Sequence, residues 1–318
     1  MLIKWVFVFF PVVTAAYPRW FESYKQQFNK NYGLHVEHKR FLMLEQKINY
    51  INENSTLNHG LSLALQNFSD VRNSNLIKSN KILTNYRRLA SKSYHKKRHR
   101  LGIPSSFDWR SKGFVNDPIA QGPCGGCFAI AAITNLEFWH KKMGGKLLNL
   151  SVQEAIDCTR PTTDGCDGGL MEDVYNLAKK NPIGPATFDP FVYHNSRCKR
   201  RVFRPYVRVK NFKVMTQEWN SHIEKNLPMN LLKYGPIPIG VDSTSLQFEL
   251  YQNGILRKQH CGNEIDHAVV VVGYTPSYWI IKNSWGKSWG QNGYFYLERH
   301  TGACGINSYS SFATEVEI

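Results

Sequence analysis

The chain has seven cysteines, so at least one thiol is left over if the others form disulfides. One cysteine, Cys127, lies in a sequence context that favours a nucleophilic thiolate. Cys127 ends the run Gln121-Gly-Pro-Cys-Gly-Gly-Cys127, and an apolar helix is predicted to begin there. A helix N-terminus and a nearby imidazolium stabilise the thiolate, which is the reactive form of cysteine. An inert structural thiol is the alternative reading, and the polar Gln121 close by argues against it.

A histidine and an asparagine downstream can complete such a site. His267 opens a predicted strand, and Asn283 closes the next one after the turn-rich stretch 273–277. If the hairpin is centred on Thr275, His267 and Asn283 are cross-strand neighbours. The asparagine would then orient the imidazole by a hydrogen bond.

The N-terminus predicts an oxidising compartment. Residues 1–16 combine one lysine, an apolar run and small residues, as in a cleaved secretory signal. A membrane anchor is the alternative, but the apolar run is too short to span a bilayer, and no later segment predicts a membrane span. Three sequons become glycosylation candidates in the secretory pathway: Asn54, Asn67 and Asn149.

The net charge of +16 is unevenly distributed. Residues 17–100 carry 16 Lys and Arg against 5 Asp and Glu, whereas residues 101–318 carry 23 against 19. This distribution argues against nucleic acid as a partner. A polyanion-binding protein remains an alternative class of function. A further basic cluster, whose simplest interpretation is a solvated face, also fits that alternative: Lys199, Arg200, Arg201, Arg204 and Arg208.

The basic N-terminal part also predicts a removable unit. Phe41, Leu44, Ile48 and Ile51 form the apolar stripe of an amphipathic helix within residues 38–52. The basic run 94–100 follows as an exposed linker. We therefore expect a helical pro-segment with a cleavable junction between His99 and Ile103, processed at acidic pH.

The remainder predicts an α+β protein in which helices precede strands. A buried helix is expected over 128–142, and Ser151 and Glu154 form a capping-box pattern before a second helix. Short β-branched and aromatic runs predict four strands, at 237–241, 268–272, 278–281 and 293–297. A cleft between the two lobes is the natural place for a site.

Together these residues resemble the papain family of cysteine peptidases, in its cathepsin L-like branch, from Ile103 to the C-terminus. Five ordered motifs carry the resemblance: Asp108-Trp-Arg110, Gln121 with Cys124-Gly-Gly-Cys127, Cys166-Asp-Gly-Gly169, Asp266-His-Ala268 and Asn283-Ser-Trp-Gly286. The resemblance implies a papain-like two-lobe fold with a helical left lobe, an antiparallel β-barrel-like right lobe and a helical N-terminal pro-segment. The implied organisation is a signal peptide (1–16), an inhibitory pro-segment (17–102) and a peptidase domain (103–318).

The implied activity is peptide-bond hydrolysis through an acyl-enzyme, with no cofactor and no metal. Cys127 would be the nucleophile, His267 the base and acid, and Asn283 its orienting residue. Trp285 would shield their hydrogen bond, and Gln121 would donate in the oxyanion hole.

Further residues are implied to bind the substrate. Gly168 and Gly169 would pair their backbone with an extended peptide. The pocket for the second residue before the scissile bond would involve Leu170, Met171, Gly240, Ile265 and Tyr309, and Asp266 and Trp285 would also contact the substrate. The aromatic Tyr309 should shorten this pocket and favour Val or Leu over Phe.

The resemblance also implies three disulfides, which the count of six cysteines alone leaves open among fifteen connectivities. The implied pairs are Cys124–Cys166, Cys158–Cys198 and Cys261–Cys304. The implied partners are polypeptide substrates, the chain's own pro-segment and cystatin-like inhibitors, acting on a monomer. The implied location is a lysosomal or other acidic endosomal compartment, or the extracellular space.

Departures from the family pattern keep a second reading open. Gly126 and Phe128 stand where Ser and Trp are usual, and the pro-segment has Leu44 and Lys47 where Phe and Asn are usual. A catalytically weak or silent homologue that acts as a binding protein is the alternative. The chain has no insertion that would cap the cleft, so an endopeptidase is expected rather than an exopeptidase.

Overall fold

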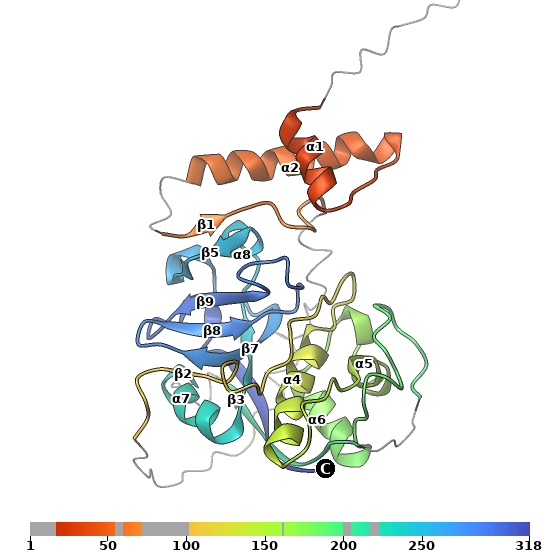
Figure 1. Cartoon of the computed structure of the whole chain (residues 1–318), viewed down its shortest axis with the longest axis vertical. Helices are drawn as coiled ribbons and strands as arrows, with labels where there is room; N and C mark the ends of the chain where they lie inside the picture. The colour runs from red at the N-terminus through yellow and green to blue at the C-terminus, as the bar shows by residue number, and fades with distance from the viewer. Residues whose placement is uncertain (1–16, 55–59, 72–101, 161, 200–204, 217–222) are drawn as a thin grey trace, which may run out of the picture.

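The chain forms two lobes side by side, with an N-terminal helical unit packed on the sheet lobe (Figure 1). The computed structural model describes residues 17–54, 60–71, 102–160, 162–199, 205–216 and 223–318. The expected signal at 1–16 and the basic run at 94–100 lie outside the described residues. The predicted α+β class, with helices before strands, is confirmed.

The helical lobe is built around one buried helix. It contains α4 (Cys127–Lys142), α5 (Val152–Cys158), the short η2 (Gly165–Asp167) and α6 (Met171–Lys180). α4 is apolar on nearly every face. One side of α4 therefore packs against α5 and α6, and its other side packs against the sheet. The Ser151 hydroxyl caps α5 by accepting from the Glu154 N–H at 2.9 Å. A capping box also predicts that the Glu154 carboxyl accepts from the Ser151 N–H. This prediction is wrong, because that carboxyl accepts from the Gly184 N–H instead.

The second lobe contains an eight-stranded sheet in the order β3-β10-β4-β7-β8-β9-β6, with β2 paired to β7. The pairs are antiparallel except β6 with β9, which is parallel. The sheet strands are β2 (Phe107–Asp108), β3 (Arg208–Thr216), β4 (Ile237–Val241), β6 (Ile255–Leu256), β7 (His267–Tyr274), β8 (Tyr278–Lys282), β9 (Tyr294–Glu298) and β10 (Tyr309–Glu317). Around them lie α7 (Ile223–Tyr234), α8 (Leu246–Glu249), β5 (Tyr251–Asn253), η3 (Lys258–His260) and η4 (Ala303–Gly305).

The predicted register of the β7–β8 hairpin is wrong. Val270 lies opposite Lys282, and a bulge between Val271 and Gly273 shifts the pairing further. The turn causes the difference, because the Thr275 hydroxyl accepts from the N–H groups of residues 277 and 278 and moves the centre past Thr275. His267 is instead directly opposite Val241 in β4.

The N-terminal unit has its own small core and adds a strand to the sheet lobe. Helices α1 (Arg19–Gln27) and α2 (Leu34–Asn54) cross and bury Phe21, Tyr24 and Leu44. The rest of the predicted α2 stripe is only half-buried. Beyond α2, β1 (Ser62–Leu63) pairs antiparallel with β5. Within the described ranges, no helix has both the length and the apolar character needed to cross a membrane.

Glu224 at the start of α7 is predicted to be a main anchor of the sheet lobe. Its buried carboxylate accepts from the indole N–H of Trp279 at 2.9 Å and from the backbone N–H groups of His300 and Gly302. Glu224→Ala leaves three donors without an acceptor and should cost about 3 kcal/mol or more of unfolding free energy. Denaturant unfolding in a Cys127→Ala background, which lacks the Cys127 thiol, measures this cost. The exposed Glu315→Ala is the control, expected to change it by less than about 0.5 kcal/mol; equal effects would contradict the assignment.

Candidate active site

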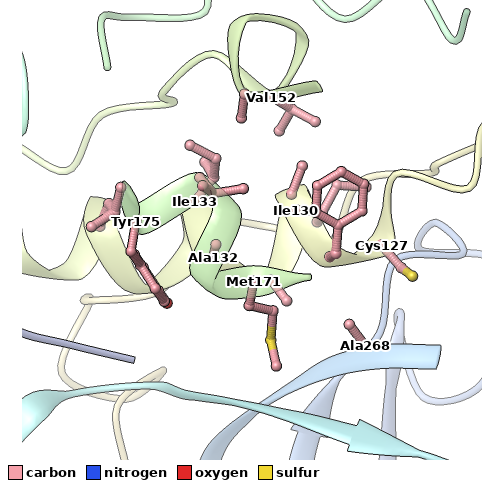
Figure 2. Packing of buried hydrophobic residues seen from close by; sticks show 14 of the residues in the cluster. Cys127, Ile130, Ala132, Ile133, Val152, Met171, Tyr175 and Ala268 are labelled. Carbon is pink, nitrogen blue, oxygen red and sulfur yellow. The ribbon is translucent and has the colours of Figure 1, made fainter. Parts of the chain in front are cut away.

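Cys127 is the first residue of α4 and lies almost fully buried between the lobes. Figure 2 shows its sulfur turned from the end of α4 towards the strand that carries Ala268. The preceding loop is held by the Cys124–Cys166 disulfide and by the Gly125 N–H, which donates to the Cys166 carbonyl at 2.7 Å. Cys127 therefore has a fixed position at the positive end of a helix, where a thiolate is stabilised.

His267 and Asn283 form the hydrogen bond that was expected, although their strands are not in the expected register. The imidazole Nε2 lies 2.8 Å from the Asn283 Oδ1, which also accepts from the Ser284 N–H. This contact makes Nε2 the protonated ring nitrogen and leaves Nδ1 as the basic one. Burial lowers the pKa of His267 to about 4, against the opposing effect of the Asn283 hydrogen bond. The imidazole is thus neutral above that pH in this form of the protein.

An aromatic cluster covers this pair. The Trp285 indole stacks on the His267 ring with centroids 5.1 Å apart, and Phe248 packs edge-on against Trp285. Phe68 of the N-terminal unit meets Trp285 edge-on at 5.2 Å. The hydrogen bond between His267 and Asn283 is therefore shielded from water, as a low-dielectric site requires. Phe248 carries no motif that would have identified it from sequence.

Gln121 is held between the two lobes by Ser284. The Ser284 hydroxyl donates to the Gln121 Oε1 at 2.7 Å, and the Gln121 backbone N–H donates to the Ser284 carbonyl. The amide nitrogen of Gln121 donates to the Cys124 carbonyl at 3.1 Å. An amide nitrogen carries two hydrogens and can donate to more than one acceptor. Ser284 was overlooked from sequence even though it lies inside the Asn283–Gly286 motif.

Gly168 and Gly169 are required by local geometry. Gly168 has φ of +122°, a region that other residues avoid. A Cβ on Gly169 would lie 2.9 Å from the Phe128 ring and 2.7 Å from the Thr163 methyl. Phe128 is fully buried beneath this segment, so its bulk supports the glycine loop.

Packing also explains why position 126 is a glycine. A Cβ there would lie 2.8 Å from the Ile156 Cδ1 and 3.5 Å from the Cys124 sulfur. The Ile156 side chain therefore fills the space that a serine side chain at position 126 would need.

The expected pocket residues gather beside the candidate catalytic residues. Leu170, Met171, Ile265 and Tyr309 are buried in one apolar cluster that also contains Ala268. Gly240 lies opposite Ala268 in the sheet.

Asp266 differs from these residues, because its carboxyl holds the adjacent loop. It accepts from the N–H and hydroxyl of Ser243 at 2.8 and 3.1 Å. Burial raises the pKa of Asp266 to about 7.

The remaining expected positions are placed as follows. The three disulfides are Cys124–Cys166, Cys158–Cys198 and Cys261–Cys304, the pairs that the resemblance implied. The sequon residues Asn67 and Asn149 are exposed, and the Asn54 amide donates to the Tyr50 carbonyl. Among the residues that the structure describes, no three His, Cys, Asp or Glu side chains gather as metal ligands would.

The second basic cluster is partly engaged within the fold. Lys199 pairs with Asp189, and the Arg208 guanidinium donates to the carbonyls of Lys179 and Lys180 at the end of α6. Arg200, Arg201 and Arg204 lie outside the described residues.

Comparisons with known proteins agree with this geometry. Residues 103–314 match the sequence model described as "Papain family cysteine protease". "Cysteine protease XCP2" of Arabidopsis thaliana is 32% identical, covering 93% of this chain and 86% of its own length. "Probable cysteine protease RD21B" of the same plant is 33% identical over 94% of this chain, which spans about two thirds (66%) of that relative. The proform of the ragweed pollen allergen Amb a 11 cysteine protease superposes with a TM-score of 0.80 at 27% identity, covering 92% of each chain.

The chain belongs to the papain family of cysteine proteases. Its fold is the papain-like two-lobe fold, and the likeness to a proform extends over the N-terminal helical unit.

The fit between Gly126 and Ile156 generates a stability prediction. Gly126→Ser should cost about 1–2 kcal/mol, because the new Cβ overpacks against the Ile156 Cδ1. Ile156→Val removes that carbon and by itself costs about 1 kcal/mol. The double variant should be no less stable than Ile156→Val alone. Urea unfolding of the four proteins in a Cys127→Ala background measures the coupling, and strictly additive costs would refute the packing explanation.

Proposed function

We propose that the protein is a cysteine endopeptidase that hydrolyses peptide bonds through a Cys127–His267–Asn283 site. One observation supports this above the others. The His267 ring is fixed by Asn283 at 2.8 Å beside a cysteine at the N-terminus of α4. A nucleophile, a base and an orienting group in this order are the arrangement that activates a thiol.

The acylation step follows from these positions. The Nδ1 of His267 takes the proton of Cys127, and the thiolate attacks the carbonyl carbon of the scissile bond to form a carbon–sulfur bond. The resulting oxyanion receives hydrogen bonds from the Cys127 backbone N–H and from the Gln121 amide. The imidazolium then donates its proton to the departing amine as the carbon–nitrogen bond breaks.

Deacylation repeats the steps with water. His267 takes a proton from the water that attacks the thioester, and the thiolate leaves when the tetrahedral intermediate collapses. The peptide itself would lie extended along Gly168 and Gly169, whose small size lets the two backbones approach.

We propose that the chain is made as a zymogen, with a signal peptide at 1–16, a pro-segment at 17–102 and the peptidase domain at 103–318. The docking contacts support this organisation. Lys47 of α2 forms a buried ion pair with Glu249 of α8 and also donates to the Ser69 carbonyl at 2.8 Å. The Ala64 N–H and the Gln66 amide donate to the carbonyls of Leu250 and Tyr251.

Acid conditions would release this segment. Burial raises the pKa of the Glu249 carboxyl, so acid removes the charge that pairs with Lys47. The turn after Phe68 also depends on the Asp70 carboxylate, which accepts from Tyr24, Lys30 and Tyr32. Loss of the Phe68 contact would expose the site to water and move the pKa of His267 up from about 4 towards its ordinary value. We propose activation in a lysosomal or other acidic compartment or after secretion, with polypeptide substrates and cystatin-like inhibitors as the partners of a monomer.

Labelling of the nucleophile tests the proposed activity. The acid-processed protein is treated with an epoxide that alkylates thiols, and the adduct is mapped by peptide mass spectrometry. We expect one adduct on Cys127 with loss of peptide hydrolysis, and neither labelling nor hydrolysis in Cys127→Ser. No adduct on Cys127, or full activity in Cys127→Ser, would overturn the proposal. An adduct in a protein that hydrolyses no peptide would favour the silent-homologue alternative.

The ion pair between Lys47 and Glu249 provides a test of docking. Lys47→Met leaves the Glu249 carboxylate buried without its counter-charge, so the full-length chain should process at least about fivefold faster at a fixed mildly acidic pH. Lys47→Met with Glu249→Gln leaves neither charge and should return the rate towards that of the parent. Lys25→Met is the control, because the ion pairs that the structure describes for Lys25 are with Glu22 and Glu37, inside the pro-segment unit. N-terminal sequencing of the product reports the junction; a product that retains Tyr17 would contradict the zymogen proposal.

A further inference from the structure

The residues expected to form the substrate pocket beside the candidate nucleophile include a buried tyrosine. Tyr309 opens β10, is 1% exposed and lies in the apolar cluster with Met171 and Ile265. Figure 2 shows Met171 and Cys127 pointing from neighbouring helices to the strand that carries Ala268, the residue after His267. The tyrosine therefore belongs to the same buried cluster as Cys127 and Ala268.

The position of the Tyr309 ring depends on Gly240. A Cβ on Gly240 would lie 3.3 Å from the Tyr309 Cδ1 and 2.5 Å from the Ile265 Cγ2. Gly240 has an ordinary backbone conformation, so its missing side chain serves packing. The tyrosine ring and the Ile265 side chain occupy the volume that a larger residue would fill.

A carboxyl group on the opposite lobe holds the phenol. Glu172, in the first turn of α6, is 2% exposed, and its Oε2 accepts a hydrogen bond from the Tyr309 hydroxyl. The groups that face this carboxyl are Tyr309, Tyr175, Asp173 and Ser311. Burial raises the pKa of Glu172 to about 7, while the Tyr309 hydrogen bond lowers it. Both the acid and the carboxylate have an oxygen that can accept from the phenol.

A buried phenol and a buried carboxyl each carry a desolvation cost that only a partner offsets. The two groups satisfy one another across the lobes, which removes most alternative rotamers of Tyr309. Its ring is therefore fixed where it closes the pocket, rather than free to swing away from an incoming side chain.

We propose that Glu172 is a positioning residue for substrate specificity, because it holds Tyr309 across the pocket for the second residue before the scissile bond. The pocket then admits a branched aliphatic side chain such as Val and excludes Phe. The inference rests on the proposed endopeptidase function, and it assigns to Glu172 a role that acts through Tyr309. A direct role, in which the carboxylate binds a basic side chain, is the competing outcome.

The test compares two peptide substrates that differ only in Val or Phe at that position. In Glu172→Ala the phenol loses its acceptor, so the ratio of kcat/KM for Phe over Val should rise by at least about tenfold. Tyr309→Ala should raise the ratio similarly. Glu172→Gln retains an acceptor oxygen and should keep the parental ratio. A general loss of stability would not explain a change of the ratio in Glu172→Ala that is absent in Glu172→Gln.

The double variant separates positioning from a direct role. If Glu172 acts through Tyr309, Glu172→Ala should change the ratio little in a Tyr309→Ala background. Asp173→Ala is the matched control, because it removes the neighbouring carboxyl that accepts from the Leu170 N–H and should leave the ratio unchanged. Additive effects, an unchanged ratio in Glu172→Ala, or preference of the parent for Arg would overturn the inference. Absence of hydrolysis of any substrate by the parent, with no Cys127 adduct, would instead refute the proposed function.

Discussion

Burial of helix α4 between the two lobes is the constraint on which the site depends. The helix packs on α5 and α6 on one side and on β4, β7 and β10 on the other, so its rotation and depth are fixed. Its polar side chains have specific partners. The Asn135 amide donates to the Pro236 carbonyl at 2.9 Å and accepts from the Ala313 N–H, and the Trp139 indole donates to the Ala313 carbonyl. A helix held on all faces places the Cys127 sulfur with little freedom.

The same helix brings opposite charges into the interior. Glu137 of α4 accepts from the Leu150 N–H at 3.0 Å, and Lys282 of β8 donates to the Thr134 hydroxyl at 3.4 Å. Burial raises the pKa of Glu137 and lowers that of Lys282, and each charge opposes the shift of the other. Removing either group would leave the other buried without its counter-charge. Lys282 directly precedes Asn283, so this interaction also helps to fix the strand end that orients His267.

The proposed catalytic groups come from different elements, and polar contacts across the junction of the lobes align them. Cys127 begins α4, whereas His267 opens β7 and Asn283 directly follows β8. The two hydrogen bonds between Gln121 and Ser284 link the loop before α4 to the segment after β8. The Tyr309–Glu172 contact links the lobes again among the residues proposed to bind the substrate. The proposed chemistry and specificity thus depend on the same interlobe packing.

The sequence by itself determined the class of fold, the buried helix over 128–142 and the four predicted strands, because periodicity and flanking glycines are local signals. It also identified the residue types for the site, since Cys127, His267, Asn283 and Gln121 lie in compact motifs. The strand β10 and the long strand β3 were not predicted, because their pairing depends on residues about a hundred positions apart. Only the tertiary structure decided the β7–β8 register, the role of Ser284 as a link, the buried Lys47–Glu249 pair and the Glu172–Tyr309 contact. The register depends on the hydrogen bonds of the Thr275 turn. The other three features join side chains that are distant in sequence, and polar contacts across a packed interface leave no periodic trace in the chain.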